Sequence, residues 1–272
     1  MATEIPRLPE PTWFVGCGNM GQAIVGGWRA AGLDLSPAVV IRPSGLPVTG
    51  VRTVTTYADA GIPARLVVLG FKPQKLDEIA PELSEWIVGG TTIVSLLAGV
   101  ETASLRQRFP AASTIVRAMP NMPVAIRRGV IALYSDDADD KTRLELANLF
   151  APLGFAPWMA DEAKFSAVGA VAGSGPAYVA RFIAALTKAA EARGLSNEIA
   201  STIALETVLG TGWLAAAGGE SMDEIARSVA SPNGTTEAGL EVLDKALDRL
   251  ILETVDTSTR RGRQLAEAAR LS

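Results

Sequence analysis

Short runs of apolar, mostly β-branched residues recur along the first half of the chain, separated by helix-compatible segments such as residues 73–86. Runs that are apolar throughout are typical of strands buried on both faces in a parallel sheet. One run alone also fits a fragment of a buried helix, but the repetition at this spacing favours alternating strands and helices. The runs lie at residues 12–15, 39–41, 51–54, 66–69, 92–96, 114–116 and 129–134.

The pattern changes after about residue 161, beyond which no run is typical of a strand. Long alanine-rich segments with helical periodicity follow at residues 176–193, 197–217 and 239–270. Breaks are expected at Gly194, at residues 218–219 and at residues 231–234. The sequence therefore predicts an α/β domain with a mostly parallel, doubly wound sheet in residues 1–163. An all-α domain is expected in residues 164–272.

A glycine-rich loop directly follows the first apolar run. Residues 16–21 have the pattern G-x-G-x-x-G and open a helix, which is the context of a dinucleotide-binding Rossmann fold. Gly16 permits the tight turn, Gly18 lets the backbone approach the pyrophosphate, and Gly21 allows close packing of the helix on the strand. The alternative is a glycine-rich turn without a ligand. The cofactor contacts predicted in the loop are Gly16, Gly18, Asn19, Met20 and Gly21.

The second strand ends in Arg42, Pro43 and Ser44 rather than in an acidic residue. An acidic residue at this point binds the ribose hydroxyls of NAD, whereas an arginine accommodates the 2′-phosphate of NADP. Arg42 and Ser44 therefore predict NADPH as the cofactor, with NADH possible; a solvated surface arginine is the alternative. Asp34 lies before the strand and is typical of a turn residue.

Histidine is absent from the 272 residues, and Cys17 is the one cysteine. The chain therefore has no Ser-His-Asp triad, no histidine-containing zinc site and no thiolate metal cluster, so its chemistry depends on a cofactor or on other polar side chains. A single cysteine forms no intramolecular disulfide, which fits a reducing compartment. Cys17 lies at a helix start that would activate a thiol, but we expect it to be a small packing side chain.

The formal net charge is −4, and no long run of like charge occurs, which argues against a nucleic-acid or anionic-membrane surface. Residues 1–11 are polar and proline-rich and contain no apolar stretch of signal-peptide type. Residues 167–190 form the most apolar long stretch. They are interrupted by residues 173–176 and carry Arg181, which a membrane-spanning helix tolerates poorly. We expect a cytoplasmic protein with no membrane or nucleic-acid partner.

Five segments together resemble the pyrroline-5-carboxylate reductase family over nearly the whole length. They are F-V-G-C-G-N-M-G at 14–21, F-K-P-Q at 71–74, R-A-M-P-N-M-P at 117–123, G-S-G-P-A-Y at 173–178 and S-P-N-G-T-T at 231–236. The resemblance implies that the helical domain is a dimerisation domain. It also implies a homodimer of interlocked helical domains, with higher assemblies of dimers known in the family. The implied reaction, in proline biosynthesis, is hydride transfer from NAD(P)H to the cyclic imine of pyrroline-5-carboxylate, which gives L-proline.

The same resemblance implies site residues. Thr236 would hydrogen-bond the imine nitrogen, and the turn that contains Ser231, Asn233, Gly234 and Thr235 would bind the substrate carboxylate through its backbone N–H groups. A helix N-cap is the plainer interpretation of this segment and is compatible with the first. Ser174 is expected either near the substrate or simply at a helix start.

The resemblance also places Lys72 and Pro73 near the nicotinamide ribose, although Lys72 also fits a surface lysine. The loop containing Asn121 is expected to line the nicotinamide pocket, with Met119 and Met122 packing rather than taking part in chemistry.

Two positions depart from the family pattern, because Ala172 and Asn233 stand where the family more often has serine and glycine. An imine reductase with another substrate therefore remains an alternative. A β-hydroxyacid dehydrogenase is disfavoured, because residues 173–178 contain no lysine and Lys188 lies three turns further on. A non-catalytic nucleotide-binding protein is the alternative from another class.

Overall fold

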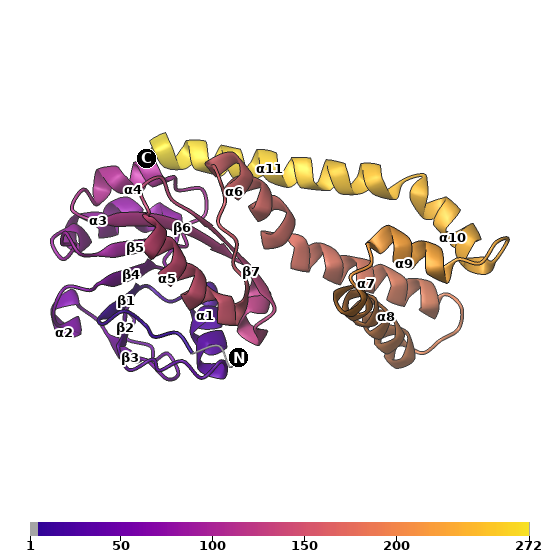
Figure 1. The fold of residues 1–272 in the computed structure, drawn as a ribbon, viewed down its shortest axis with the longest axis horizontal. Helices are drawn as coiled ribbons and strands as arrows, with labels where there is room; N and C mark the ends of the chain where they lie inside the picture. The colour runs from indigo at the N-terminus through magenta and orange to yellow at the C-terminus, as the bar shows by residue number, and fades with distance from the viewer. Residues whose placement is uncertain (1–4, 272) are drawn as a thin grey trace. The chain divides into compact units, whose positions relative to one another are not determined.

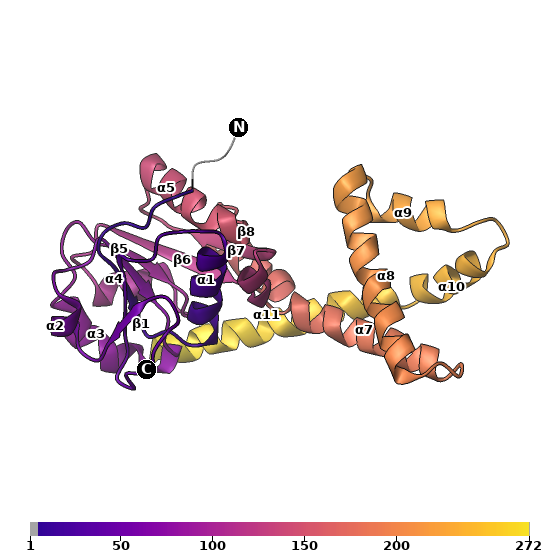
Figure 2. The same cartoon turned by 90° about the horizontal axis from the view of Figure 1, so that it is seen from below.

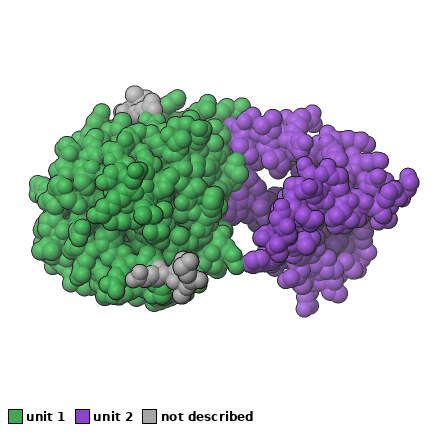
Figure 3. Space-filling view, in the orientation of Figure 1, with its two compact units in different colours: residues 1–174, 258–272 green, residues 175–257 purple. Residues whose placement is uncertain are grey.

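The computed structural model describes residues 5–271, apart from the side chains of residues 265, 266 and 268–271. The chain forms two compact units, coloured separately in Figure 3. The first unit comprises residues 1–174 and 258–272, and the second comprises residues 175–257. The predicted boundary between residues 163 and 164 therefore differs from this division, in which residues 164–174 and the described residues from 258 onward belong to the unit of the sheet. The expectation about residues 1–11 lies partly outside the described residues.

The first unit is built on an eight-stranded sheet with the order β3-β2-β1-β4-β5-β6-β7-β8. All neighbouring strands are parallel except β6 and β7, which are antiparallel. This confirms the predicted mostly parallel α/β fold. The strands are β1 (Thr12–Val15), β2 (Ala38–Ile41), β3 (Arg52–Val54), β4 (Leu66–Leu69), β5 (Thr92–Ser95), β6 (Thr114–Pro120), β7 (Gly129–Tyr134) and β8 (Gly154–Phe155).

Both faces of the sheet are covered, as the continuous apolar strands predict. Phe14 contributes to one hydrophobic cluster, whereas its neighbours Trp13 and Val15 contribute to the other. The helices α1 (Asn19–Ala30) and α5 (Asp140–Phe150) pack into the cluster of Phe14. The helices α2 (Tyr57–Ala60), α3 (Leu76–Ser84) and α4 (Thr102–Arg108) pack into the other (Figure 1).

The strand edges differ from the predictions in two places. β6 continues to Pro120, because Arg117–Pro120 pair with Ile131–Tyr134 of β7. β8 was not predicted, because two residues carry no periodicity. The 3₁₀ turns Pro73–Lys75, Met122–Ile126 and Ala151–Leu153, the helix α6 (Glu162–Val168) and the π-helical turn Gly169–Gly173 complete the first unit before residue 174.

The second unit consists of α7 (Gly175–Glu191), α8 (Asn197–Gly218), α9 (Met222–Val229), α10 (Thr235–Asp244) and the first part of α11 (Leu247–Leu271). The breaks predicted at Gly194 and at residues 231–234 fall between these helices, and the break at residues 218–219 coincides with the end of α8. The described backbone after residue 162 contains no strand. The predicted helix at 239–270 is in fact α10 and α11. Helix α9 was missed, although Ser221 and Glu224 form a capping box at its start. Figure 2 shows the extended turn that joins α9 to α10.

Helix α8 is long and apolar enough to cross a membrane by length and composition alone. Its most apolar 18-residue window has a mean hydropathy of 1.3, and 11% of that window is buried in the single chain. Residues 167–190, the stretch that the sequence predicts as the most apolar, are divided in the structure between α6, the π-helical turn and α7.

Close packing of α1 depends on Gly27. A Cβ atom on Gly27 would overlap the carbonyl oxygen of Val124, whereas a Cβ atom on the adjacent Gly26 would meet nothing within 4 Å. The glycine pattern predicts close packing of α1 on the strand at Gly21, which is a different contact. In the structure a Cβ atom on Gly21 would instead lie 3.0 Å from the Cys17 Sγ atom, so Gly21 faces a side chain of the loop rather than the strand.

The two adjacent glycines provide a matched test. We expect Gly27→Ala to lower the free energy of unfolding by about 1–3 kcal/mol, because a backbone carbonyl cannot move aside as a side chain can. Gly26→Ala should raise it by about 0.5–1 kcal/mol, since alanine favours helix over glycine. Urea unfolding of both variants measures the difference. Equal stability of Gly27→Ala and the wild type would contradict the close approach.

Candidate active site

The glycine loop prepares the N-terminus of α1 to bind an anion. Gly16 has a φ of +72°, and a Cβ atom there would lie 3.0 Å from the Phe71 Cβ atom and 3.1 Å from the Gly70 carbonyl group. Gly18 is the N-cap of α1; no side-chain bond caps the helix there, and its first turn contains no acidic residue. The first N–H groups of the helix are therefore available to phosphate oxygens.

The surroundings of Gly18 leave room for a ligand. A Cβ atom on Gly18 would meet only the Gly70 carbonyl oxygen, at 3.9 Å. The Gly18 N–H group donates to that same oxygen at 3.4 Å, which ties the loop to the end of β4.

Cys17 is a packing residue. Its side chain is buried, and burial raises the pKa of the thiol to about 11, partly opposed by the charge of Arg42. The thiol is therefore protonated at neutral pH, which is the opposite of a cysteine activated at a helix start. This supports the expectation that Cys17 fills the variable position of the loop.

A cleft of about 880 Å³ opens at the carboxyl ends of β1, β2 and β4; we call it the cofactor cleft. The carboxyl edge is where open parallel sheets bind their ligands. Eight of the ten predicted cofactor residues line it together: Gly16, Gly18, Asn19, Met20, Gly21, Arg42, Ser44 and Lys72. Pro73 begins the 3₁₀ turn directly after Lys72.

Arg42 lies against the glycine loop. Its Nε atom donates to the Ser44 Oγ atom at 2.9 Å, and its Nη1 atom donates to the Cys17 carbonyl oxygen at 3.5 Å. These bonds hold the guanidinium group at the cleft, which disfavours the alternative of a freely solvated arginine. Asp34 is a turn residue as expected: it accepts bonds from the Ser36 N–H and hydroxyl groups, which lower the pKa of its carboxyl group.

A second cavity, of about 400 Å³, adjoins this cleft; we call it the inner cavity. Met20 and Leu96 line both, so the two spaces meet at these side chains. The walls of the inner cavity come from the residues that follow β5, from the end of β6, from α6 with its π-helical turn, and from α11. The lining residues include Ser95, Leu97, Ala98, Gly99, Met119, Pro120, Phe165, Gly169, Ser258 and Arg263.

Sequence reasoning missed most of the inner cavity. The rule that ligands bind at the carboxyl edge would have selected residues 95–99, because they follow a predicted strand. No sequence signal connects the end of β6 with residues 258–263, which lie more than a hundred positions further along the chain.

Arg117 is a charged residue that lines the inner cavity. It is also the first residue of the motif at 117–123. It is buried, and its Nη1 atom lies 2.8 Å from the Glu162 Oε1 atom. Its guanidinium carbon lies 4.4 Å from the centre of the Phe165 ring.

Asn121 lines neither space described above. Its Nδ2 atom donates to the Ala172 carbonyl oxygen at 3.0 Å, and its Oδ1 atom accepts from the Val130 N–H group at 2.9 Å. Its amide therefore joins β7 to the π-helical turn, and its contact with the nicotinamide stays a prediction. Met119 packs as expected, because a Cβ atom on Gly169 would overlap its sulfur atom.

Ser174 closes the first unit. Its Oγ atom lies 3.3 Å from the Oγ atom of Ser258, which lines the inner cavity.

The remaining predicted residues form a tight turn before α10, in the second unit. The Gly234 N–H group donates to the Ser231 carbonyl oxygen at 2.9 Å, and Asn233 has a φ of +58°. Asparagine therefore adopts the left-handed conformation that glycine would favour, so this departure leaves the turn intact. Helix α10 begins at Thr235, and its N-cap residue Gly234 supplies no side-chain cap.

The turn is also a helix start, as the plainer interpretation holds. The Glu237 side chain in the first turn of α10 accepts from the Asn233 N–H group at 2.6 Å, which ties the turn to the helix. Thr236 is half-buried in the single chain, whereas Ser231 and Thr235 are exposed.

Comparison with known protein families gives two matches. Residues 162–265 match the model of the pyrroline-5-carboxylate reductase dimerisation domain. Residues 13–99 match the model of NADP oxidoreductases that depend on coenzyme F420.

Individual relatives agree with the first match. The chain is 36% identical over 265 residues to a pyrroline-5-carboxylate reductase of Pseudomonas aeruginosa, covering 93% of this chain and 96% of the relative. It is 29% identical over 270 residues to pyrroline-5-carboxylate reductase 2 of Bacillus subtilis, covering 93% and 94%.

A solved pyrroline-5-carboxylate reductase from Coxiella burnetii has a TM-score of 0.88 at 30% identity, covering 95% of this chain and 99% of the other. The Plasmodium falciparum pyrroline carboxylate reductase, solved with NADP bound, shares the fold with a TM-score of 0.84 at 21% identity, covering 96% and 99%. The chain belongs to the pyrroline-5-carboxylate reductase family.

Proposed function

We propose that this protein is an NAD(P)H-dependent pyrroline-5-carboxylate reductase that reduces the cyclic imine of 1-pyrroline-5-carboxylate to L-proline. The observation that carries the proposal is a cofactor cleft that meets an inner cavity at Met20 and Leu96, in a chain matching such reductases over almost its full length. The bound cofactor would supply the hydride.

The residues of the cofactor cleft fit a phosphorylated dinucleotide. The uncapped N–H groups at the start of α1 would hold the pyrophosphate. Arg42 and Ser44 would hold a 2′-phosphate, because a guanidinium group and a hydroxyl group both donate to phosphate oxygens. This supports NADPH over NADH. Lys72, Pro73 and Asn121 are proposed to lie toward the nicotinamide end.

The inner cavity is proposed to hold the nicotinamide ring beside the imine. Its lining is largely apolar, with Leu96, Met119 and Phe165 among the contributors, so it would exclude water from the hydride path. A cyclic imine protonates readily, and as an iminium ion it is already electrophilic. The protein then has to orient the nicotinamide and the imine and to supply one proton to the imine nitrogen. Neither task requires a histidine.

The turn before α10 is proposed to bind the substrate. The turn residues Ser231, Asn233, Gly234 and Thr235 would receive the carboxylate, since a helix N-terminus attracts an anion. The Asn233 N–H group donates to Glu237 and the Gly234 N–H group to the Ser231 carbonyl oxygen, so the substrate carboxylate would take the place of Glu237 at Asn233. The Thr236 hydroxyl group would hydrogen-bond the imine nitrogen. Ser174 is proposed to lie near the same substrate.

The surface of the second unit supports a homodimer. Helix α7 buries no residue in the single chain, and α8 buries only Ala200 and Ala204. Monomeric proteins seldom expose so large an apolar surface. The exposed fractions of six apolar side chains lie between 44% and 54%, namely Val179, Phe182, Ile199, Ile203, Leu209 and Trp213.

We propose that a second copy covers these helices, in line with the match to the dimerisation domain. Burial against that copy would also account for the apolarity of α8. Higher assemblies of dimers and a cytoplasmic location are part of the same proposal. The single cysteine and the net charge of −4 are compatible with that location.

The first test is the loss of absorbance at 340 nm when purified protein is mixed with DL-pyrroline-5-carboxylate and either NADPH or NADH. We expect turnover with proline as the product and faster turnover with NADPH. Cofactor binding without turnover would overturn the proposed substrate. Other cyclic imines would then be tried in the same assay.

Arg42→Asp tests the cofactor assignment. We expect the KM for NADPH to rise about 10- to 100-fold, because a charge-assisted bond is lost and a like charge is introduced, while the KM for NADH should fall. Arg52→Ala is the control, since Arg52 lies in β3 and does not line the cleft. Unchanged KM values for both cofactors in Arg42→Asp would contradict the assignment.

Thr236→Ala tests the contact with the imine nitrogen. The value of kcat/KM for the imine should fall about 5- to 150-fold, which corresponds to about 1–3 kcal/mol of transition-state stabilisation. Thr236→Ser keeps the hydroxyl group and should retain most of the activity. Wild-type kinetics in Thr236→Ala would exclude the role.

A further inference from the structure

The inner cavity contains a charged pair that the proposed reaction does not use. Arg117 is buried, yet it belongs to the cavity lining, and its partner Glu162 begins α6. Burying the Arg117 charge is costly unless it is paired and hydrogen-bonded, and Glu162, whose side chain is 29% exposed, supplies that partner beside the cavity.

Arg117 lies in the middle of β6, between two neighbouring strands. In the sheet register it pairs with Ser95 of β5 on one side and with Tyr134 of β7 on the other. Its guanidinium group stacks on Phe165 of α6, and Phe165 also packs against the ring of Tyr134, with ring centres 6.3 Å apart. Arg117 therefore connects β6 to α6, which forms one wall of the cavity.

Glu162 connects that wall to a second one. Its Oε1 atom accepts a hydrogen bond from the Arg117 Nη1 atom at 2.8 Å and another from the Thr102 N–H group at 3.2 Å. Thr102 is the first residue of α4, whose N-cap residue, Glu101, makes no side-chain cap bond. Glu162 thus caps α4 from a helix that lies 60 positions later in the chain.

Two walls of the inner cavity are formed by residues next to the starts of α4 and α6. The residues just before α4, including Ala98 and Gly99, line the inner cavity on one side. The residues just after Glu162, including Phe165 and Gly169, line it on another. One carboxylate therefore holds the start of α4, the start of α6 and the middle of β6 together around the cavity.

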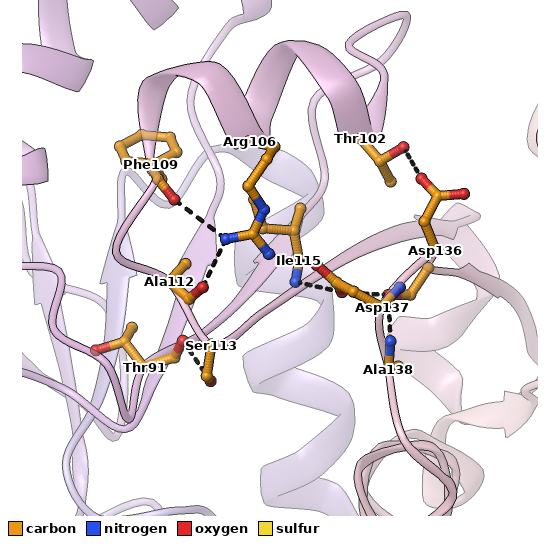
Figure 4. Close-up of polar contacts among 11 residues, drawn as sticks. Thr91, Thr102, Arg106, Phe109, Ala112, Ser113, Ile115, Asp136, Asp137 and Ala138 are labelled. Carbon is orange, nitrogen blue, oxygen red and sulfur yellow. Dashed lines mark hydrogen bonds and ion pairs between the residues drawn. The ribbon is translucent and has the colours of Figure 1, made fainter.

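Further bonds hold Thr102 in place. Its hydroxyl group donates to Asp136, which also accepts from the Tyr134 hydroxyl group. Figure 4 shows Thr102 pointing toward Asp136, about one turn along α4 from Arg106.

We infer that Arg117 and Glu162 are positioning residues that fix the distance between the walls of the inner cavity, and hence the approach of the imine to the nicotinamide. The inference rests on the proposed function, because it assigns the hydride transfer to this cavity. The pyrophosphate end of the cofactor is held elsewhere, by the glycine loop, and does not depend on the pair.

A second ion pair on α4 provides a matched control. Arg106 bonds to Asp137 and donates to the Ala112 carbonyl oxygen, and Asp137 accepts from the Ile115 N–H group (Figure 4). This pair also joins α4 to the loop after β7, but neither residue lines the inner cavity. Its loss should affect stability without changing the geometry of the cavity.

The experiment compares Glu162→Gln and Arg117→Met with Asp137→Asn in the full-length protein. The measurements are kcat, the dissociation constant of NADPH, the melting temperature, and the kinetic isotope effect with NADPH deuterated at the transferred position. We expect Glu162→Gln and Arg117→Met to lower kcat at least about tenfold and to raise the isotope effect, since misplaced partners slow the transfer step. NADPH affinity should stay within about twofold, because the pair does not contact the pyrophosphate site. Asp137→Asn should lower the melting temperature and leave kcat unchanged.

Wild-type kcat and isotope effect in Glu162→Gln would overturn the inference, as would an equal loss of kcat in Asp137→Asn. If Arg117→Met does not fold, Arg117→Lys replaces it. Lysine keeps the positive charge but lacks the planar guanidinium group that bonds to Glu162 and stacks on Phe165.

If the wild type does not reduce the imine, the proposed function fails on its own. The inference is then tested by measuring the fluorescence lifetime of bound NADPH, which depends on the surroundings of the nicotinamide, in the wild type and the variants. A lifetime changed in Glu162→Gln but not in Asp137→Asn supports it, and an unchanged lifetime overturns it.

Discussion

The unstaggered register of the parallel strands is the constraint on which the rest of the structure depends. Ile41 pairs with Val15, Val15 with Leu69, and Leu69 with Ser95, so β2, β1, β4 and β5 end at the same level. β6 passes this level at Arg117 and continues to Pro120. The loops that follow the carboxyl ends of these strands therefore begin next to one another. The glycine loop, the turn at Lys72, the residues after Ser95 and the end of β6 form one continuous lining for that reason.

The close approach of two loops at this edge restricts which residues can occupy them. Gly16 and Gly70 lie backbone to backbone, and a Cβ atom on Gly70 would lie 2.8 Å from the Gly16 carbonyl oxygen. Side chains are therefore excluded at Gly16 and Gly70, and the N-terminus of α1 faces the open cofactor cleft. Arg42 then bonds to the Cys17 carbonyl group and brings a positive charge to the same space. Backbone geometry and charge together produce an anion site from residues that are far apart in the sequence.

Most of the fold and much of the cofactor cleft could be predicted from the sequence, because the signals are local. Continuous apolar runs indicate buried strands, and a glycine pattern between a strand and a helix indicates a phosphate loop. The misses have physical reasons too. The two residues of β8 are too few to show a period, and the break between α10 and α11 at Lys245 and Ala246 carries neither glycine nor proline. The close packing of α1 on the turn at Val124 depends on Gly27, and only the packed structure shows which glycine of the helix meets a carbonyl group.

The sequence by itself determined the sheet, the glycine loop, the class of cofactor and the family motifs, since each depends on residues that are neighbours in the chain. Only the tertiary structure decided how the inner cavity is walled. Arg117, Glu162 and Thr102 come from three separate segments, and nothing in their spacing indicates that one carboxylate bonds to both of the others. Their meeting follows from the packing of α4 and α6 against β6, which is a property of the folded chain and not of any local pattern.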